Sequence, residues 1–302
     1  MDTRTLEYFL KIAEYQSITK AAADLHIAQP YLTRQLQSLE AEVGVPLFIR
    51  EKKRLHITEE GRLFQEETRQ ILDLLDKTIG QMRSIHSDIG GKLFVGAIET
   101  AGTQFLPDWI EGFRKLYPSV TYSLWAANSE DVIARLAKGL LDIALIREPY
   151  DEDQFEGIRI TEENWIAIVP ADSPFAKSSE PLTLDQLAQA ELMVPAQRTR
   201  QISGWFQEKG LKARILCEFT PLMNGVAMAE KGLGISILPA SAARSLDKAR
   251  AVCCAIAPPQ KTCVDLIWRR DGNLSAAARH FTDYVRKLQG CAGSLLSLRL
   301  PR

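Results

Sequence analysis

Residues 17–44 read SITKAAADLHIAQPYLTRQLQSLEAEVG, two helical patterns separated by a turn of three or four residues. Ser17 is expected to cap the first helix, which turns the small side chains of Ala21 and Ala22 inward. The second helix opens with polar residues and Pro30, which a first helical turn tolerates because it has no use for the missing N–H. Two helices joined this tightly indicate a helix-turn-helix unit.

The second helix has two distinct faces. Leu32, Leu36 and Leu39 fall within a narrow arc of the helical wheel and are expected to face the core. Arginine, glutamine and threonine on the other side are residue types that read base edges in the DNA major groove. The alternative to a DNA-reading face is a polar face that only contacts solvent. The tight turn and a basic segment downstream argue against this alternative. The candidate DNA-reading residues are Gln29, Pro30, Tyr31, Thr33, Arg34 and Gln37.

A cationic turn follows in residues 47–58, LFIREKKRLHIT. Two short apolar runs flank the charged residues, which is typical of a small hairpin with a basic tip. Such a wing suits contact with phosphates or the minor groove beside a recognition helix. The candidate phosphate-contacting residues are Arg50, Lys52, Lys53 and Arg54.

These segments resemble the winged helix-turn-helix of LysR-type transcriptional regulators, and the resemblance extends over nearly the whole chain. Its most specific residues are Ala21, Ala22, Leu25, Gln29, Pro30, Arg34, Gln35, Leu39, Glu40, Gly44, Leu47, Phe48, Arg50, Thr58 and Gly61. One departure is Ala28, where the family usually has a serine that caps the recognition helix. The resemblance implies a sequence-specific regulator that binds double-stranded DNA and a small-molecule effector, with no catalytic residues and no cofactor.

Residues 59–89 read as one long helix with a heptad pattern. The seam positions are Phe64, Thr68, Ile71, Leu75, Thr78, Met82 and Ile85. This pattern predicts a homodimer through the linker helix, as the resemblance also implies. The alternative is an amphipathic helix packed against its own domain. A homotetramer is implied by the resemblance alone.

Residues 90–302 alternate strand and helix patterns, which predicts an α/β region with parallel strands and crossover helices. The strand candidates are 92–98, 120–125, 142–146, 164–169, 191–194, 213–219, 234–238 and 262–269, with helices at 104–116, 129–138 and 221–231. These strands could form a single sheet. The resemblance instead implies two α/β subdomains like those of periplasmic binding proteins, subdomain I at about 90–163 and 266–302, and subdomain II at about 164–265. The expected order is therefore an all-α winged helix-turn-helix over 1–58, the linker helix, and this effector-binding region.

Polar residues follow several of the predicted strands, where ligands collect in open α/β sheets. Hydroxyl groups and guanidinium groups together favour a small carboxylate or similar anion. The alternative for each arginine is a surface ion pair, as between Arg147 and Glu148. In the family, the segments matching 100–102 and 197–201 line the effector cleft. The candidate effector-binding residues are Thr100, Ala101, Gly102, Asn128, Arg147, Arg198, Thr199, Arg200 and Gln201.

Composition disfavours other classes. The five cysteines include no CxxC pair and the four histidines lack ligand spacing, so we expect reduced thiols, buried at Cys253 and Cys254, a cytoplasmic protein and no metal site. No nucleophile elbow or phosphate loop supports an enzyme. The absence of a long apolar run argues against a membrane protein, and the absence of a signal peptide argues against an exported transport-type binding protein. The net charge of -1 excludes only a polyanion-binding surface spread over the whole chain.

Overall fold

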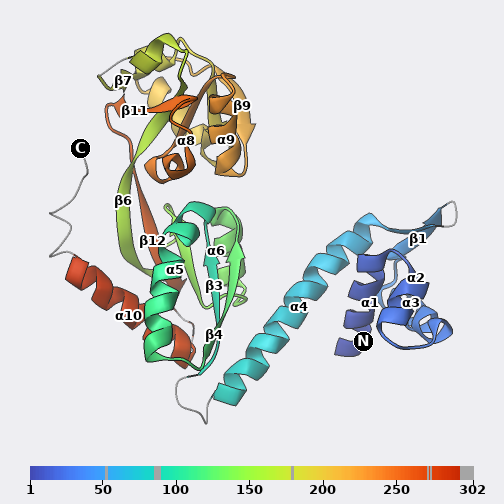
Figure 1. The fold of residues 1–302 in the computed structure, drawn as a ribbon. Coiled ribbons are helices and arrows are strands. Elements are labelled where there is room, and N and C mark those ends of the chain that lie inside the picture. Colours follow the sequence, from blue (N-terminus) through green and yellow to red (C-terminus); the bar gives the residue numbers. More distant parts are fainter. Residues whose placement is uncertain (52–53, 85–89, 178–179, 271, 273, 293–302) are drawn as a thin grey trace. The chain divides into compact units, whose positions relative to one another are not determined.

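The computed structural model describes residues 1–51, 54–84, 90–177, 180–270, 272 and 274–292. The chain folds as two compact units, Met1–Asp88 and Ile89–Arg302. The first unit contains α1 (Thr3–Tyr15), α2 (Ile18–Asp24), α3 (Gln29–Val43), β1 (Phe48–Glu51), β2 (Arg54–Ile57) and α4 (Glu59–Ser84) (Figure 1).

The helices of the first unit pack around one apolar core. Ala21 and Ala22 are buried in it, and the Ser17 hydroxyl accepts a hydrogen bond from the backbone N–H of Lys20, which confirms the predicted cap. The buried side of α3 is formed by the leucines at 32, 36 and 39, as its periodicity predicts. Because this core occupies one side of α3, the opposite side of the helix is left facing outward.

The hairpin of β1 and β2 is tied to the helices at its base. The Glu40 carboxylate on α3 accepts hydrogen bonds from the backbone N–H groups of Leu47 (2.8 Å) and Phe48 (3.0 Å). The Thr58 hydroxyl donates to the carbonyl of Pro46 at 2.9 Å and accepts from the backbone N–H of Gly61 at 2.9 Å. These bonds fix the wing to both α3 and the start of α4.

The second unit is a mixed α/β structure with short 3₁₀ segments. Its strands are β3 (Gly91–Ala97), β4 (Val120–Ala126), β5 (Ile143–Arg147), β6 (Phe155–Pro170), β7 (Leu182–Thr183), β8 (Leu192–Pro195), β9 (Ile215–Phe219), β10 (Ile235–Pro239), β11 (Ala251–Ala257) and β12 (Lys261–Arg269). Its helices are α5 (Glu99–Leu116), α6 (Ser129–Ala137), α7 (Leu184–Leu187), α8 (Thr199–Gln207), α9 (Leu222–Glu230) and α10 (Ala276–Ala292). The 3₁₀ segments are η1 (Pro174–Lys177), η2 (Ala196–Arg198) and η3 (Ala240–Ser245).

The long strand β6 belongs to two sheets. Its first part pairs with β12, which continues through β5 and β3 to β4. Its last part pairs with β10 on one side, leading to β8 and β9, and with β11 on the other. Figure 1 shows β6 and β12 side by side, as their pairing requires. The α/β alternation predicts parallel pairing, but β6 and β12 run antiparallel to their neighbours, so both sheets are mixed.

Each sheet is covered on both faces, so each subdomain has two cores of its own, one on each face of its sheet. In subdomain I, with β3 to β5, one core lies under α5 and α10 and another lies beside α6. In subdomain II, with β7 to β11, one core includes α7 and α8 and another includes α9 and η3. The chain therefore folds as a helix-turn-helix unit followed by an α/β region of two subdomains.

The close approach of α4 to the wing predicts a cost for any side chain at Gly61. A Cβ there would collide with the Leu47 carbonyl oxygen and the Ile57 side chain. We expect Gly61→Ala to lower the unfolding free energy of the first unit by about 1–3 kcal/mol, the usual cost of overpacking. Urea denaturation followed by circular dichroism measures this loss. Gly204→Ala on α8, where a Cβ meets no atom within 4 Å, is the control, and equal midpoints for both variants would contradict the prediction.

Candidate functional site

The first turns of α3 present the polar face that its sequence predicts. Thr33 is half-buried, and the remaining predicted reading residues are exposed: Gln29, Pro30, Tyr31, Arg34 and Gln37. The Gln29 side-chain amide donates to the Thr33 hydroxyl at 2.8 Å, and the Arg34 Nε donates to the carbonyl of Pro30 at 3.4 Å. These local bonds hold the polar groups together on one face.

The residues around this face show how it is positioned. Ala28 occupies the N-cap position of α3, and its methyl side chain cannot accept a hydrogen bond from the helix backbone. The start of α3 therefore has no side-chain cap. Tyr31 packs its ring edge-on against Tyr8 of α1, with the ring centroids 6.3 Å apart. The ring of Tyr31 is therefore supported by α1 while part of it remains exposed.

The wing carries arginines at both strands. Arg50 on β1 and Arg54 on β2 are exposed. In the antiparallel strand pairing, the backbone of Arg54 lies opposite that of Glu51. Lys52 and Lys53, the other two predicted phosphate contacts, lie outside the described residues.

The heptad seam of α4 divides into two parts. Phe64 packs edge-on against Phe9 in the first unit's core at 5.0 Å, and Thr68 is fully buried. Further along, Ile71, Leu75 and Met82 are exposed, Met82 by 57 %. Ile85 lies outside the described residues. The start of the seam thus packs within its own unit, and the apolar residues that follow face solvent.

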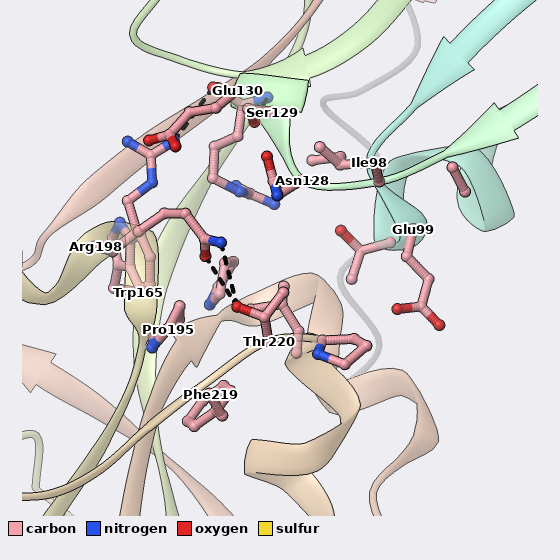
Figure 2. A pocket seen from close by; sticks show the side chains of 18 residues that line it. Ile98, Glu99, Asn128, Ser129, Glu130, Trp165, Pro195, Arg198, Phe219 and Thr220 are labelled. Atoms are coloured by element: carbon pink, nitrogen blue, oxygen red, sulfur yellow. Dashed lines mark hydrogen bonds between the residues drawn. The ribbon is translucent and has the colours of Figure 1, made fainter. Parts of the chain in front are cut away.

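A cavity of about 380 Å³ lies between the two subdomains of the second unit (Figure 2). Subdomain I contributes Ile98, Glu99, Thr100, Ala126, Ala127, Asn128, Ser129, Glu130 and Arg147. Subdomain II contributes Pro195, Gln197, Arg198, Phe219, Thr220, Pro221, Leu222 and Pro239, and β6 contributes Trp165. The walls come from strand ends and helix starts, the places where α/β sheets bind ligands.

The structure brings part of the predicted effector set to this cavity. Thr100, Asn128, Arg147 and Arg198 line it. Ala101 and Gly102 lie behind the wall; Ala101 is buried, and a Cβ at Gly102 would come within 3.0 Å of the Cβ of Ala97 on β3. The Thr199 hydroxyl is within hydrogen-bond distance of the Pro195 carbonyl, Arg200 is exposed, and Gln201 lines a neighbouring cavity of about 460 Å³ that also includes Arg198.

Arg147 joins the two subdomains through Glu163 on β6. Arg147 is 4 % exposed, and its Nη2 lies 2.7 Å from the Glu163 carboxylate. Glu163 also accepts hydrogen bonds from the backbone N–H and the hydroxyl of Ser241 on η3. The adjacent Glu148, the partner suggested by sequence, pairs instead with Arg159 at 3.2 Å. The reason is that Glu163 lies on β6, which β12 separates from the strand of Arg147, and its carboxylate reaches the buried guanidinium.

The Arg198 guanidinium carries positive charge into the cavity wall, where the carboxylates of Glu130 and Glu148 are close enough to act on it electrostatically. Among the described residues, no carboxylate lies within ion-pair distance of it, and its Nη2 donates to the carbonyl of Arg147 at 3.3 Å. Burial, followed by the nearby charge of Arg147, lowers the pKa of the Arg198 guanidinium. A lowered arginine pKa means that the surroundings disfavour the cation, although arginine remains protonated at neutral pH.

Sequence reasoning missed several wall residues. Trp165 lies within β6, edge-on to Trp205 with the ring centroids 5.7 Å apart. Thr220 precedes α9, and its hydroxyl lies 3.2 Å from the side-chain amide of Gln197 across the cavity wall. A strand-end signal exists for both residues beside α9, because Phe219 ends the predicted strand 213–219 and Thr220 follows it. Trp165 has no such signal, since it lies in the middle of a long strand.

Other classes of site receive no support from the described residues. No group of three or more His, Cys, Asp and Glu side chains in that part of the chain is arranged to hold a metal ion. None of the described helices combines the length and apolarity needed to cross a bilayer. Cys217, Cys253, Cys254 and Cys263 are free thiols. Cys254 and Cys263 are buried, whereas Cys253 is exposed rather than buried as expected.

Two domain models of one protein family match the chain. Residues 3–62 match the bacterial regulatory helix-turn-helix protein, lysR family, and residues 86–290 match the LysR substrate binding domain.

Individual proteins match over most of their length. The transcriptional regulator YnfL of Escherichia coli (strain K12) is 31% identical over 93% of this chain and 96% of its own. The probable cat1 operon transcriptional activator of Acinetobacter lwoffii is 29% identical over 80% of this chain and 82% of its own. A crystal structure of full-length CbnR with its target DNA has a TM-score of 0.75 at 28% identity, covering 95% of this chain and 99% of that chain.

The buried pair of Arg147 and Glu163 predicts a large effect of neutralising the acid. In Glu163→Gln the guanidinium stays buried without a countercharge, which costs about 3–5 kcal/mol in comparable buried pairs. Urea denaturation followed by tryptophan fluorescence measures this loss, because all five tryptophans lie in the second unit. Glu162→Gln is the control, since Glu162 forms an exposed pair with Lys261 and little change is expected. Similar midpoints for the two variants would contradict the prediction.

Proposed function

Since the chain belongs to the LysR family of DNA-binding transcription regulators that carry an effector-binding domain, we propose that a small anion, such as a carboxylate, controls it from the cavity between the C-terminal subdomains. The observation that carries this proposal is the charge of Arg198 in the cavity wall. Arg147 is already neutralised by Glu163, whereas Arg198 has no carboxylate within ion-pair distance among the described residues. An anion in the cavity would supply the missing countercharge.

For the DNA complex, we propose that the outward face of α3 enters the major groove and that the wing contacts the backbone beside it. Support comes from the exposed amide and guanidinium groups of Gln29, Arg34 and Gln37, which suit base edges. The exposed Arg50 and Arg54 suit phosphates. A relative of similar fold has been solved with its target DNA.

We also propose that two copies associate through α4. The exposed apolar residues Ile71, Leu75 and Met82 follow a heptad spacing, and a second copy of the helix would remove them from water. A dimer would place two recognition helices on two half-sites of the DNA, one from each copy of the chain. Association of dimers into a tetramer is proposed from family membership.

Control by an effector requires that the anion favour one arrangement of the assembly over another. Residues from both subdomains line the cavity, so an anion that contacts both sides stabilises the closed arrangement relative to the open one. The free energy by which the anion stabilises the closed arrangement over the open one is what the effector can transmit to DNA binding.

The reading face is tested by Arg34→Ala. Loss of a bidentate contact to a guanine is worth about 1–3 kcal/mol of discrimination, so the variant should select a relaxed motif from a random DNA pool. Arg54→Ala on the wing should weaken binding to all sequences and leave the selected motif unchanged, with a shallower salt dependence. Sequencing of the selected pools, with binding titrations at several salt concentrations, measures both effects. An unaltered motif for Arg34→Ala would refute the assigned reading face.

The effector site is tested by Arg198→Ala in thermal-shift measurements over a panel of small carboxylates and inorganic phosphate. Anions that stabilise the native protein should lose most of that shift in the variant, because the uncompensated charge is gone. Arg200→Ala is the control, since Arg200 is exposed and does not line the cavity. Equal stabilisation of the native protein and of Arg198→Ala by the same anions would contradict the anion proposal.

A further inference from the structure

We propose that the effector is a monocarboxylate with an apolar body larger than one benzene ring, and that Trp165, Arg147 and Thr100 hydrogen-bond its carboxylate. This inference rests on the proposed role of the cavity as the effector site. It adds the chemical class of the ligand and the groups that recognise it.

Most of the cavity wall is apolar. Its apolar residues include Ile98, Pro195, Phe219, Pro221, Leu222 and Pro239. Hydroxyl or amide groups of a ligand that face these apolar residues would lose their water without gaining partners, and polar partners are confined to wall residues such as Asn128, Ser129, Gln197 and Thr220. A hydrocarbon body loses nothing there and gains from its removal from water.

The volume of the cavity indicates how large this hydrocarbon body is. An apolar cavity of about 150 Å³ holds one benzene molecule. The present cavity, at about 380 Å³, is more than twice that size. A ligand that fills it therefore needs a fused ring system or a ring with a chain of several atoms.

Three of the described side chains that line the cavity carry buried polar atoms without hydrogen-bond partners. Trp165 Nε1, Arg147 Nη1 and Thr100 Oγ1 are buried and have no hydrogen-bond partner among the described residues. Trp165 is 1 % exposed and Arg147 is 4 % exposed, so bulk solvent does not satisfy these groups either. The indole and guanidinium N–H groups can only donate, which requires acceptor atoms on the ligand. Carboxylate oxygens accept several such bonds at once.

The distribution of charge favours one carboxylate over two. Arg198 places positive charge at one side of the cavity, and Figure 2 shows Glu99 on the side opposite Arg198. A second carboxylate at the far end of a ligand would approach Glu99, and like charges disfavour that placement.

The test measures dissociation constants of defined probes for the full-length protein by isothermal titration calorimetry. The aryl series is benzoate, 4-phenylbutanoate and 2-naphthoate, each with its uncharged amide, and the comparison anions are glutarate and inorganic phosphate. We expect the two larger carboxylates to bind more tightly than benzoate. We also expect them to bind at least tenfold more tightly than their amides, glutarate or phosphate.

Trp165→Phe removes the indole N–H and keeps an aromatic ring, so it should weaken the larger carboxylates by on the order of tenfold, as for a lost hydrogen bond to a charged group. Trp205→Phe is the matched control, because Trp205 contacts Trp165 and does not line the cavity. Thr100→Val, compared with Thr103→Val on the same helix, provides a second measurement that decides the case if Trp165→Phe does not fold.

Each result has a definite meaning. Glutarate or phosphate binding that depends on Arg198, with no aryl carboxylate bound, would overturn the apolar-body inference and leave the proposed anion control standing. Amides that bind as well as their carboxylates, or no binding by any probe, would overturn the inference together with the anion proposal. Native affinity in folded Trp165→Phe and Thr100→Val would overturn the roles given to those side chains.

Discussion

The pairing of β6 with β12 is the constraint on which the C-terminal region depends. These strands pair from Lys261 opposite Asn164 to Arg269 opposite Phe155, with a register shift between Val264 and Asp265, and beyond this β6 continues into the second sheet. Two separately packed subdomains are thereby connected by a small number of backbone crossings. The cavity arises because the cores of neither subdomain extend across this crossing, and the buried contact of Arg147 with Glu163 is formed there.

The helix-turn-helix unit was predictable because its signals are local. A 3.6-residue period, a serine cap and a tolerated proline are each read from a few neighbouring residues, and the observed α2 and α3 follow them. The bond from Gln29 to Thr33 depends on side-chain rotamers and could not be predicted from spacing alone. The seam of α4 shows the same limit: periodicity identified an apolar stripe, but only the packed structure separates Phe64, held in the core, from the exposed Ile71.

The cavity was only partly predictable, because its wall is assembled from distant segments. Strand-end reasoning found Thr100, Asn128, Arg147 and Arg198, since each follows or begins a recognisable element. The first half of β6, FEGIRITEEN, alternates exposed and buried residues with many charges, so it gave no apolar run, and the strand was predicted to begin nearer its buried second half. Trp165 was consequently placed at a strand start rather than in the middle of a crossing strand. The partner of Arg147 was misjudged for a related reason, because nearness in sequence suggested Glu148 whereas the sheet supplies Glu163.

The same construction makes the cavity suitable for regulation. Each subdomain buries its own apolar residues, so a change in the angle between them need not disturb either core. The free energy that sets this angle is then concentrated in few contacts, including that of Glu163 with Ser241 and that of Arg198 with the carbonyl of Arg147. A ligand that contacts residues of both subdomains acts directly on this small balance, so modest binding energy suffices to shift it. Linkage then imposes reciprocity: an effector that changes the affinity for DNA by some factor must itself bind the DNA complex with an affinity changed by the same factor.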